Sequence, residues 1–157
     1  MSRPYILLVE DNPDDEALTL RAFSKNKIEN DIVVTRDGAQ ALDFLLKKGD
    51  FTNRQQVENP QVIFLDLKLP KISGLEVLKQ IRTEPSTRLI PVVVFTSSKE
   101  DEDILQSYKN GANSFVRKPI EFSEFSNAVK ELGLYWVLLN QADHRWPKDR
   151  PAPTLSV

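Results

Sequence analysis

Short apolar runs alternate with longer amphipathic stretches along this chain. Nearly continuous apolar runs predict strands that are buried on both faces, and the amphipathic stretches between them predict helices. This alternation is typical of a parallel sheet covered by helices on both faces, so it predicts an α/β fold. Five runs have the length and composition of strands: Tyr5 to Val9, Asp31 to Thr35, Val62 to Leu65, Val92 to Phe95 and Ser114 to Val116.

Capping residues indicate where the helices begin and end. Asn12 is a favourable N-cap, and the proline after it fits the first turn of a helix. Residues 73–76 and 98–101 have, or come close to, the sequence of a capping box. Gly49 and Gly111 suit the left-handed conformation in which many helices end. The predicted helices therefore follow directly after the predicted strands.

Two segments depart from this regular alternation. Residues 48–60 are polar and lack clear periodicity, which predicts a long surface loop; a functional loop and a tolerated insertion explain it equally well. Residues 121–141 predict one long helix, and the repeated prolines of residues 143–157 favour an extended or disordered tail. We therefore expect one domain over residues 1–142, followed by a Pro-rich C-terminal tail.

Length and composition narrow the class of protein. A chain of 157 residues with 40% hydrophobic and 28% charged residues is typical of one globular domain, and its net charge of -2 argues against a basic nucleic-acid-binding face. The absence of cysteine excludes disulfides, thiolate catalysis and Cys-based zinc sites. The single histidine, His144, lies beside the tail and is a poor candidate for acid–base catalysis. No apolar run is long enough for a signal peptide or a membrane span, so we expect a cytoplasmic protein.

Polar side chains stand at the carboxyl ends of the predicted strands. Glu10 and Asp11 follow the first strand, Asp66 the third and Thr96 the fourth, while Lys118 comes shortly after the fifth. The carboxyl ends of parallel strands share one edge of the sheet, where ligands bind. We therefore expect these five side chains to converge.

The three carboxylates of this set repel one another unless a cation lies among them. A hard divalent ion with oxygen ligands, Mg²⁺ above all, meets that need, and Lys118 adds a further positive charge. Such cations favour phosphoryl transfer because they neutralise the phosphoryl oxygens. Asp66 follows the central strand and is the candidate nucleophile, which would form an aspartyl phosphate.

Four motifs, LVEDNPDD, FLDLKLP, VFTSS and FVRKP, resemble in order and spacing those of the response-regulator receiver domain, over about residues 5–139. The resemblance implies a flavodoxin-like, doubly wound five-stranded parallel sheet with strand order 2-1-3-4-5 and helices on both faces. It also implies a single-domain response regulator of a two-component phosphorelay, in which Asp66 accepts a phosphoryl group from a histidine kinase. Such a protein signals by protein–protein contact or by phosphorelay. Beyond Mg²⁺-dependent self-phosphorylation and autodephosphorylation, no enzymatic activity is expected.

The resemblance further implies individual roles at the site. Asp11 matches a direct Mg²⁺ ligand, and Glu10 matches the acid that acts on the metal through water. The phospho-acceptor Asp66 is itself a metal ligand, and the backbone carbonyl of Lys68 completes the protein ligands. Mn²⁺ could substitute for Mg²⁺. Thr96 matches the hydroxyl that hydrogen-bonds the phosphoryl oxygen, and Lys118 matches the lysine that pairs with the phosphate.

Other positions match residues that, in this family, change conformation on phosphorylation or control the lifetime of the phosphoryl group. Pro119 matches a cis-proline that would direct the neighbouring lysine inward. Phe115 falls at the switch aromatic but has no hydroxyl, and an ordinary core aromatic is the rival explanation. Lys68 and Ser98 flank the path of the hydrolytic water in this family, so we expect them to tune the phosphoryl lifetime.

Individual sequence features argue against three alternative functions. Phosphatases with an aspartate nucleophile need a second acid where this chain has Lys68. The five glycines are scattered and form no phosphate loop, which argues against nucleotide use. A flavin in the same crevice would meet carboxylates that repel its phosphate. A receiver-shaped binding module that works without phosphorylation stays open as the alternative function.

The end of the predicted last helix suggests a partner surface. Tyr135, Trp136 and Leu138 add apolar residues beyond those needed for packing on the sheet, which predicts an interface. Receiver domains often dimerise through helix 4, strand 5 and helix 5, so we expect a homodimer, with a folded-back tail as the alternative. Residues 48–51, residues 107–108 and the Tyr135-Trp136 pair resemble cyanobacterial phytochrome response regulators and their bacteriophytochrome-associated relatives. A phytochrome-type histidine kinase is the expected partner; nucleic acid and membrane are not.

Overall fold

The computed structural model describes residues 4–28, 30–96, 101–117, 126–127 and 130–131. Its five strands form one parallel sheet in the order β2-β1-β3-β4-β5, which confirms the predicted fold class and strand order. The two outer strands on one side continue one residue beyond their predicted ends, so that Thr96 is the last residue of its strand. The strands are β1 (Tyr5–Val9), β2 (Asp31–Thr35), β3 (Val62–Leu65), β4 (Val92–Thr96) and β5 (Ser114–Arg117).

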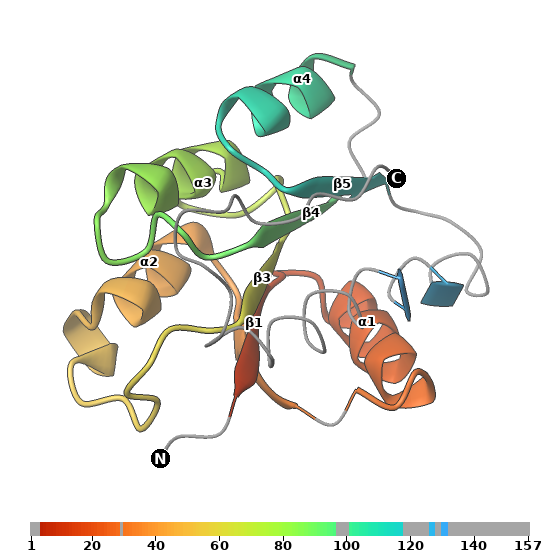
Figure 1. Ribbon diagram of the computed structural model, residues 1–157, viewed down its shortest axis with the longest axis horizontal. Helices are drawn as coiled ribbons and strands as arrows, with labels where there is room; N and C mark the ends of the chain where they lie inside the picture. Colours follow the sequence, from red (N-terminus) through yellow and green to blue (C-terminus); the bar gives the residue numbers. More distant parts are fainter. Residues whose placement is uncertain (1–3, 29, 97–100, 118–125, 128–129, 132–157) are drawn as a thin grey trace, which may run out of the picture.

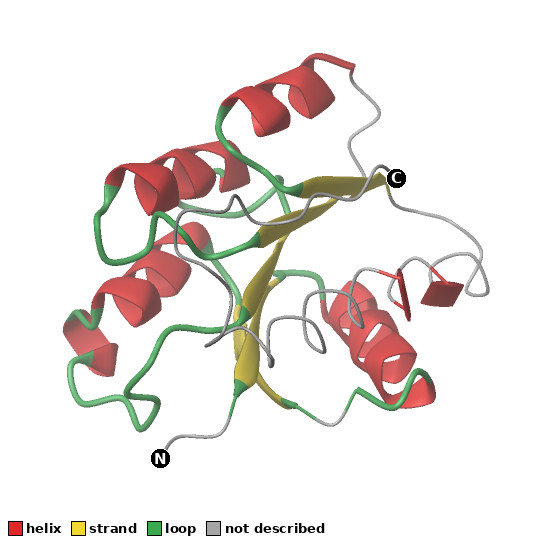
Figure 2. Ribbon diagram, viewed as in Figure 1, coloured by secondary structure: helices red, strands yellow, loops and turns green. Residues whose placement is uncertain are grey.

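The helices cover both faces of this sheet. Figure 1 shows α1 (Pro13–Lys25) on one side and α2 (Gly38–Leu46), α3 (Gly74–Thr83) and α4 (Asp101–Lys109) on the other. The short 3₁₀ helix η1 (Gly49–Phe51) follows α2. Because all five strands are parallel, their carboxyl ends lie along one edge of the sheet; Figure 2 shows the strands between the helices of the two sides.

The core has one layer on each side of the sheet. All residues of β1, β3 and β4 are buried, which explains why these strands are apolar without interruption. One face packs against Ala22 and Phe23 of α1. The other face packs against Phe44 of α2 and against Val77 and Leu78 of α3.

Most of the predicted helix caps are confirmed. Asn12 caps α1 by accepting hydrogen bonds from two backbone amides, and Ser73 caps α3 by accepting one from Glu76. Gly111 has a φ of 97° directly after α4, as a C-terminal cap requires. The cap predicted at Gly49 is wrong, because α2 already ends at Leu46 and Lys47 takes the left-handed conformation there.

The loop of residues 48–60 is held against the core by aromatic and cationic contacts. Phe51 packs edge-on against Phe44 at 5.3 Å between ring centroids, and the Arg54 guanidinium lies 4.5 Å from the centre of the Phe44 ring. The Tyr5 hydroxyl donates to the Glu58 carbonyl at 2.7 Å, and Arg54 donates to that hydroxyl at 3.3 Å. The loop is therefore anchored by side chains, although its polar sequence predicted only an irregular surface segment.

Some predictions fall on positions outside the described residues. Of the helix predicted over residues 121–141, the structure describes four residues, 126–127 and 130–131, and these are helical. The Pro-rich tail and most of the capping box at residues 98–101 lie outside the described part of the chain. None of the helices described is long and apolar enough to span a membrane.

Candidate functional site

The sheet register brings the ends of β1, β3 and β4 together. Val9 pairs with Leu65, and Leu65 pairs with Val94, so the residues that follow these strands emerge side by side. Backbone hydrogen bonds continue the sheet by one residue beyond β1 and β3. The Glu10 amide donates to the Thr35 carbonyl at 3.0 Å, and the Asp66 amide donates to the Val9 carbonyl at 3.1 Å.

Three predicted carboxylates meet at this edge. One carboxylate oxygen from each of Glu10, Asp11 and Asp66 lies within 4.8 Å of the other two. Glu10 is 2% exposed and Asp66 6% exposed, whereas Asp11 is exposed to solvent. Two of the three acids are therefore removed from water and held by the sheet, while the third leaves an open side through which a ligand can enter.

The donor set matches a divalent cation. Carboxylates placed this close repel one another, and a positive ion between them removes that cost. Three hard oxygen donors with no nitrogen or sulfur among them suit Mg²⁺, Mn²⁺ or Ca²⁺ rather than zinc or copper. The geometry of Glu10, Asp11 and Asp66 thus fits a hard divalent metal ion.

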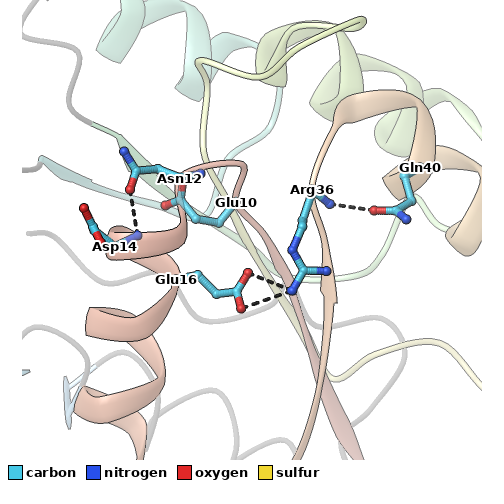
Figure 3. A network of polar contacts seen from close by, with 6 residues as sticks. All are labelled: Glu10, Asn12, Asp14, Glu16, Arg36 and Gln40. Atoms are coloured by element: carbon cyan, nitrogen blue, oxygen red, sulfur yellow. Dashed lines mark hydrogen bonds and ion pairs between the residues drawn. The ribbon is translucent and has the colours of Figure 1, made fainter.

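The acidic edge is framed by the first turns of α1 and α2. The Asn12 amide donates to Glu10 Oε2 at 3.4 Å, while the Asn12 side chain caps α1. Arg36 pairs with Glu16 at 3.1 Å, and its backbone amide donates to Gln40 Oε1 at 2.7 Å. Figure 3 shows these contacts running from the first turn of α1 across to α2. The start of α2 is thereby tied to the rim of the site.

Thr96 and Phe115 are both buried in the neighbouring strands β4 and β5. Thr96 ends β4 and is fully buried, with its backbone in register with Arg117 of β5. Phe115 is 6% exposed and belongs to a cluster with Leu67, the residue directly after Asp66, and Val94. This inward position agrees with both explanations of Phe115, the switch aromatic and the ordinary core aromatic.

Lys68 is among the residues that the structure describes, whereas several other predicted site residues are not. The Lys68 amide donates to Asp66 Oδ1 at 3.1 Å, so the loop after β3 folds over the carboxylate that precedes it. The following predicted site residues lie outside the described residues: Ser98, Lys118, Pro119, Tyr135, Trp136 and Leu138.

Sequence reasoning missed a set of residues that border the loop after Asp66. Asp37 and Gly38 at the start of α2 contact that loop, and Lys71 within it has a φ of 67°. A signal was present in the sequence. Asp37-Gly38 and Ser73-Gly74 are both a capping residue followed by glycine, each just before an apolar helix.

An acidic cluster at the carboxyl edge of a 2-1-3-4-5 parallel sheet is the arrangement that the resemblance to a receiver domain implies. The family model described as the response regulator receiver domain matches residues 6–130. The chain belongs to this family and is a receiver-domain response regulator.

Two relatives match nearly the whole chain. The probable methanogenesis regulatory protein FilR2 of Methanothrix harundinacea is 41% identical, over 87% of this chain and 86% of its own length. The response regulator Rcp1 of Synechocystis is 34% identical, over 84% of this chain and 88% of its own length. Both are similar in extent to the chain, so the similarity is not confined to one part of a larger relative.

Solved structures of response regulators resemble the fold closely. The bacteriophytochrome response regulator AtBRR is 49% identical with a TM-score of 0.72, covering 89% of this chain and 99% of the other. The phosphorylated cyanobacterial phytochrome response regulator RcpA is 34% identical with a TM-score of 0.78, covering 87% and 95%. The Mn²⁺-bound form of Rcp1 is 34% identical with a TM-score of 0.76, covering 85% and 94%.

Proposed function

We propose that this response regulator is switched by phosphorylation of Asp66, with Mg²⁺ held by Glu10, Asp11 and Asp66. The proposal is carried by one observation, the convergence of these three carboxylates within 4.8 Å around the residue that follows the central strand. The backbone carbonyl of Lys68 is included as a fourth metal ligand on the strength of the family resemblance. The solved structure of a Mn²⁺-bound relative supports a divalent metal at a site of this kind.

The reaction places each residue in a simple role. A carboxylate oxygen of Asp66 attacks the phosphorus of a phosphohistidine, the P–N bond breaks, and the imidazole nitrogen keeps the electron pair and takes up a proton. When bound, the divalent ion neutralises charge on the phosphoryl oxygens. The Thr96 hydroxyl donates a hydrogen bond to a phosphoryl oxygen, and Lys118, which the resemblance implies is followed by a cis-proline at Pro119, pairs with another.

Intact-protein mass after incubation with acetyl phosphate and Mg²⁺ tests this function. We expect one phosphoryl group on the wild-type chain, none on Asp66→Asn, and none when the metal is removed with EDTA. Asp50→Asn is the matched control, because Asp50 is an exposed acid on η1, away from the cluster. An unmodified wild-type chain, or a modified Asp66→Asn chain, would refute the proposal and favour a phosphorylation-independent binding module.

The donor in this proposal is a phytochrome-type histidine kinase in the cytoplasm. Support comes from the resemblance to RcpA, a cyanobacterial phytochrome response regulator, and to AtBRR, a bacteriophytochrome response regulator. Phosphotransfer from a radiolabelled phytochrome kinase should be faster than from an unrelated histidine kinase. Equal rates from both would remove the phytochrome part of the proposal and leave the phospho-acceptor intact.

The output is proposed to pass through a homodimer formed by α4, β5 and the helix that follows. Tyr108 of α4 is 43% exposed and lies on this face, and Tyr135, Trp136 and Leu138 are its expected companions. In this proposal Phe115 connects this face with the site, because Phe115 packs in one cluster with Leu67, the residue after Asp66. A separate role, the control of the phosphoryl lifetime, is proposed for Lys68 and Ser98. Light scattering of the full chain and of a chain ending at Gln141 should give dimers in both cases; a monomeric full chain would contradict this.

A further inference from the structure

We propose that the start of α2, with Gly38 at its centre, positions the loop that directly follows the phospho-acceptor Asp66 and contains Lys68. Residues 67–73, which follow Asp66, are called the acceptor loop here. The inference rests on the proposed function, because the position of this loop matters only if Asp66 binds a metal ion and accepts a phosphoryl group. It adds Gly38, with the Asp37–Lys71 pair beside it, as a positioning residue that touches neither metal nor phosphoryl group.

Gly38 is in direct backbone contact with the acceptor loop. Its amide donates to the Pro70 carbonyl at 3.3 Å. A Cβ at this position would lie 2.1 Å from the Ile72 carbonyl oxygen and 2.8 Å from the Ile72 Cβ, both too close for real atoms. Gly38 does not have a positive φ, so the backbone conformation does not require glycine. Glycine is required because the loop occupies the space of a side chain.

A second glycine, Gly74, makes a similar close contact at the point where the loop begins. The Gly74 amide donates to the Leu67 carbonyl at 2.8 Å, and a Cβ there would lie 2.2 Å from the Asp66 carbonyl oxygen. Gly38 and Gly74 are the first residues of α2 and α3. Both helix starts therefore make close backbone contacts around the loop, Gly38 with Pro70 and Ile72, and Gly74 with Asp66 and Leu67.

Asp37 fixes the loop from the same helix start. Its carboxylate accepts from the Gln40 amide at 2.7 Å, which caps α2, and pairs with Lys71 Nζ at 3.4 Å. The Lys71 side chain is 68% exposed, so this ion pair contributes little energy by itself. It orients the loop, while the close contact at Gly38 sets its distance from α2.

The position of the loop sets the orientation of the Asp66 carboxylate. The Lys68 amide donates to Asp66 Oδ1 at 3.1 Å, so a shift of the loop moves this donor away from the carboxylate. Loss of a contact that orients a metal ligand typically lowers metal affinity by roughly 10- to 100-fold. Gly38 thus acts on the metal through the loop and through Asp66.

Gly38→Ala and Gly49→Ala form a matched pair of variants. Both add one methyl group to an end of the α2 region, but Gly49 has a φ of 54° and its Cβ would approach only the Asp43 carboxylate, at 3.1 Å. Titration calorimetry of the full chain with Mg²⁺ is the measurement. We expect Gly38→Ala to weaken Mg²⁺ binding by roughly 10- to 100-fold, the range typical of residues behind a metal ligand. Gly49→Ala should lose thermal stability and keep the wild-type Mg²⁺ affinity.

Equal Mg²⁺ affinity in the two variants would overturn the inference. If Gly38→Ala does not fold, amide hydrogen exchange on the wild-type chain replaces it: Mg²⁺ should slow exchange at the Gly38 amide, because that amide bonds the loop. An unchanged rate would also overturn the inference. A wild-type chain that binds Mg²⁺ but is never phosphorylated would refute the proposed function alone.

Discussion

Arg82 is an example of a single residue that joins three segments of the chain. Its guanidinium donates to the carbonyls of Gly111 at 2.8 Å, Arg88 at 3.1 Å and Ile90 at 2.6 Å, and to Asn113 Oδ1 at 2.9 Å. Burial lowers the pKa of Arg82 from its usual value. The residue ties α3 to the segments before β4 and β5, the two strands that contain Thr96 and Phe115.

Replacing Arg82 should destabilise the fold. Arg82→Met leaves these oxygens without their donor, so we expect the free energy of unfolding to fall by about 2 kcal/mol or more. Arg82→Lys should lose less, since one ammonium can satisfy part of the set but lacks the planar fork of donors. Urea unfolding of both variants is the measurement. Equal stability of Arg82→Met and wild type would show that the bonds add nothing to stability.

Tyr5 makes the stability of the fold depend on alkaline pH. Burial raises the pKa of Tyr5 from 10.0 to about 12, although the neighbouring Arg54 guanidinium opposes part of this rise. A raised pKa means that the folded chain holds this proton more tightly than the unfolded chain does. The contribution of Tyr5 to stability is therefore complete below pH 10 and is lost as the pH rises to about 12.

Unfolding by urea at several pH values between 10 and 12 tests this sign. We expect the wild-type chain to lose stability across this window and Tyr5→Phe to lose less, because phenylalanine has no proton to release. The comparison between the two chains removes the contribution of other groups that titrate there. Parallel losses in both would contradict a raised pKa at Tyr5.

At the scale of elements, helix α1 ends in a conformation that its residue does not favour. Lys27 has a φ of 58°, its amide donates to the Ser24 carbonyl, and the Ile28 amide donates to the Phe23 carbonyl. This pair of bonds is the Schellman motif, in which glycine is the usual residue at the position of Lys27. A lysine there carries the steric cost of its Cβ.

Lys27→Gly should therefore stabilise the protein. The relief of steric strain exceeds the added flexibility of the unfolded chain, and we expect a gain of about 0.5–1 kcal/mol in the free energy of unfolding. Lys27→Ala is the control, because it removes the charge but keeps the Cβ. A gain of the same size in Lys27→Ala would assign the effect to charge rather than to the backbone.

The sequence predicted the elements well where the signal was local or periodic. Strands such as β3 are buried on both faces, so four consecutive apolar residues marked their position. The cap predicted at Gly49 failed because a glycine that takes a positive φ need not end a helix; Gly49 has a φ of 54° but begins η1. The anchoring of the following loop was not predictable, because Arg54 stacks on a ring of α2 that only the folded chain brings near.

At the scale of the whole molecule, the candidate site was predictable because a parallel sheet brings strand ends together. That rule predicts that Glu10, Asp11 and Asp66 lie close together, and they meet at the edge of the sheet. The contact of Gly38 with Ile72 could not be read in the same way. It depends on the path of one loop past another helix, which no periodicity of the sequence encodes.

The three carboxylates of the acidic edge should lower the stability of the metal-free protein, because they repel one another, and the same carboxylates should bind the metal ion. An ion that binds only the folded chain stabilises it, so under the proposed function Mg²⁺ should stabilise the wild type by about 2.7 kcal/mol at 100 times its Kd. Asp11→Asn removes one of three repelling charges and should unfold at a higher temperature than wild type in EDTA. Thermal unfolding with EDTA and with Mg²⁺ is the measurement. The opposite order in EDTA would mean that repulsion at this edge is already compensated within the chain.

The most direct test of the central claim is to locate the phosphoryl group. The wild-type chain is phosphorylated with acetyl phosphate and Mg²⁺, the acyl phosphate is reduced with borohydride to a primary alcohol, and the peptides are sequenced by mass spectrometry. The account predicts the alcohol at Asp66 and at no other carboxylate. An alcohol at Asp11 or elsewhere, or none in a chain that binds Mg²⁺, would contradict it.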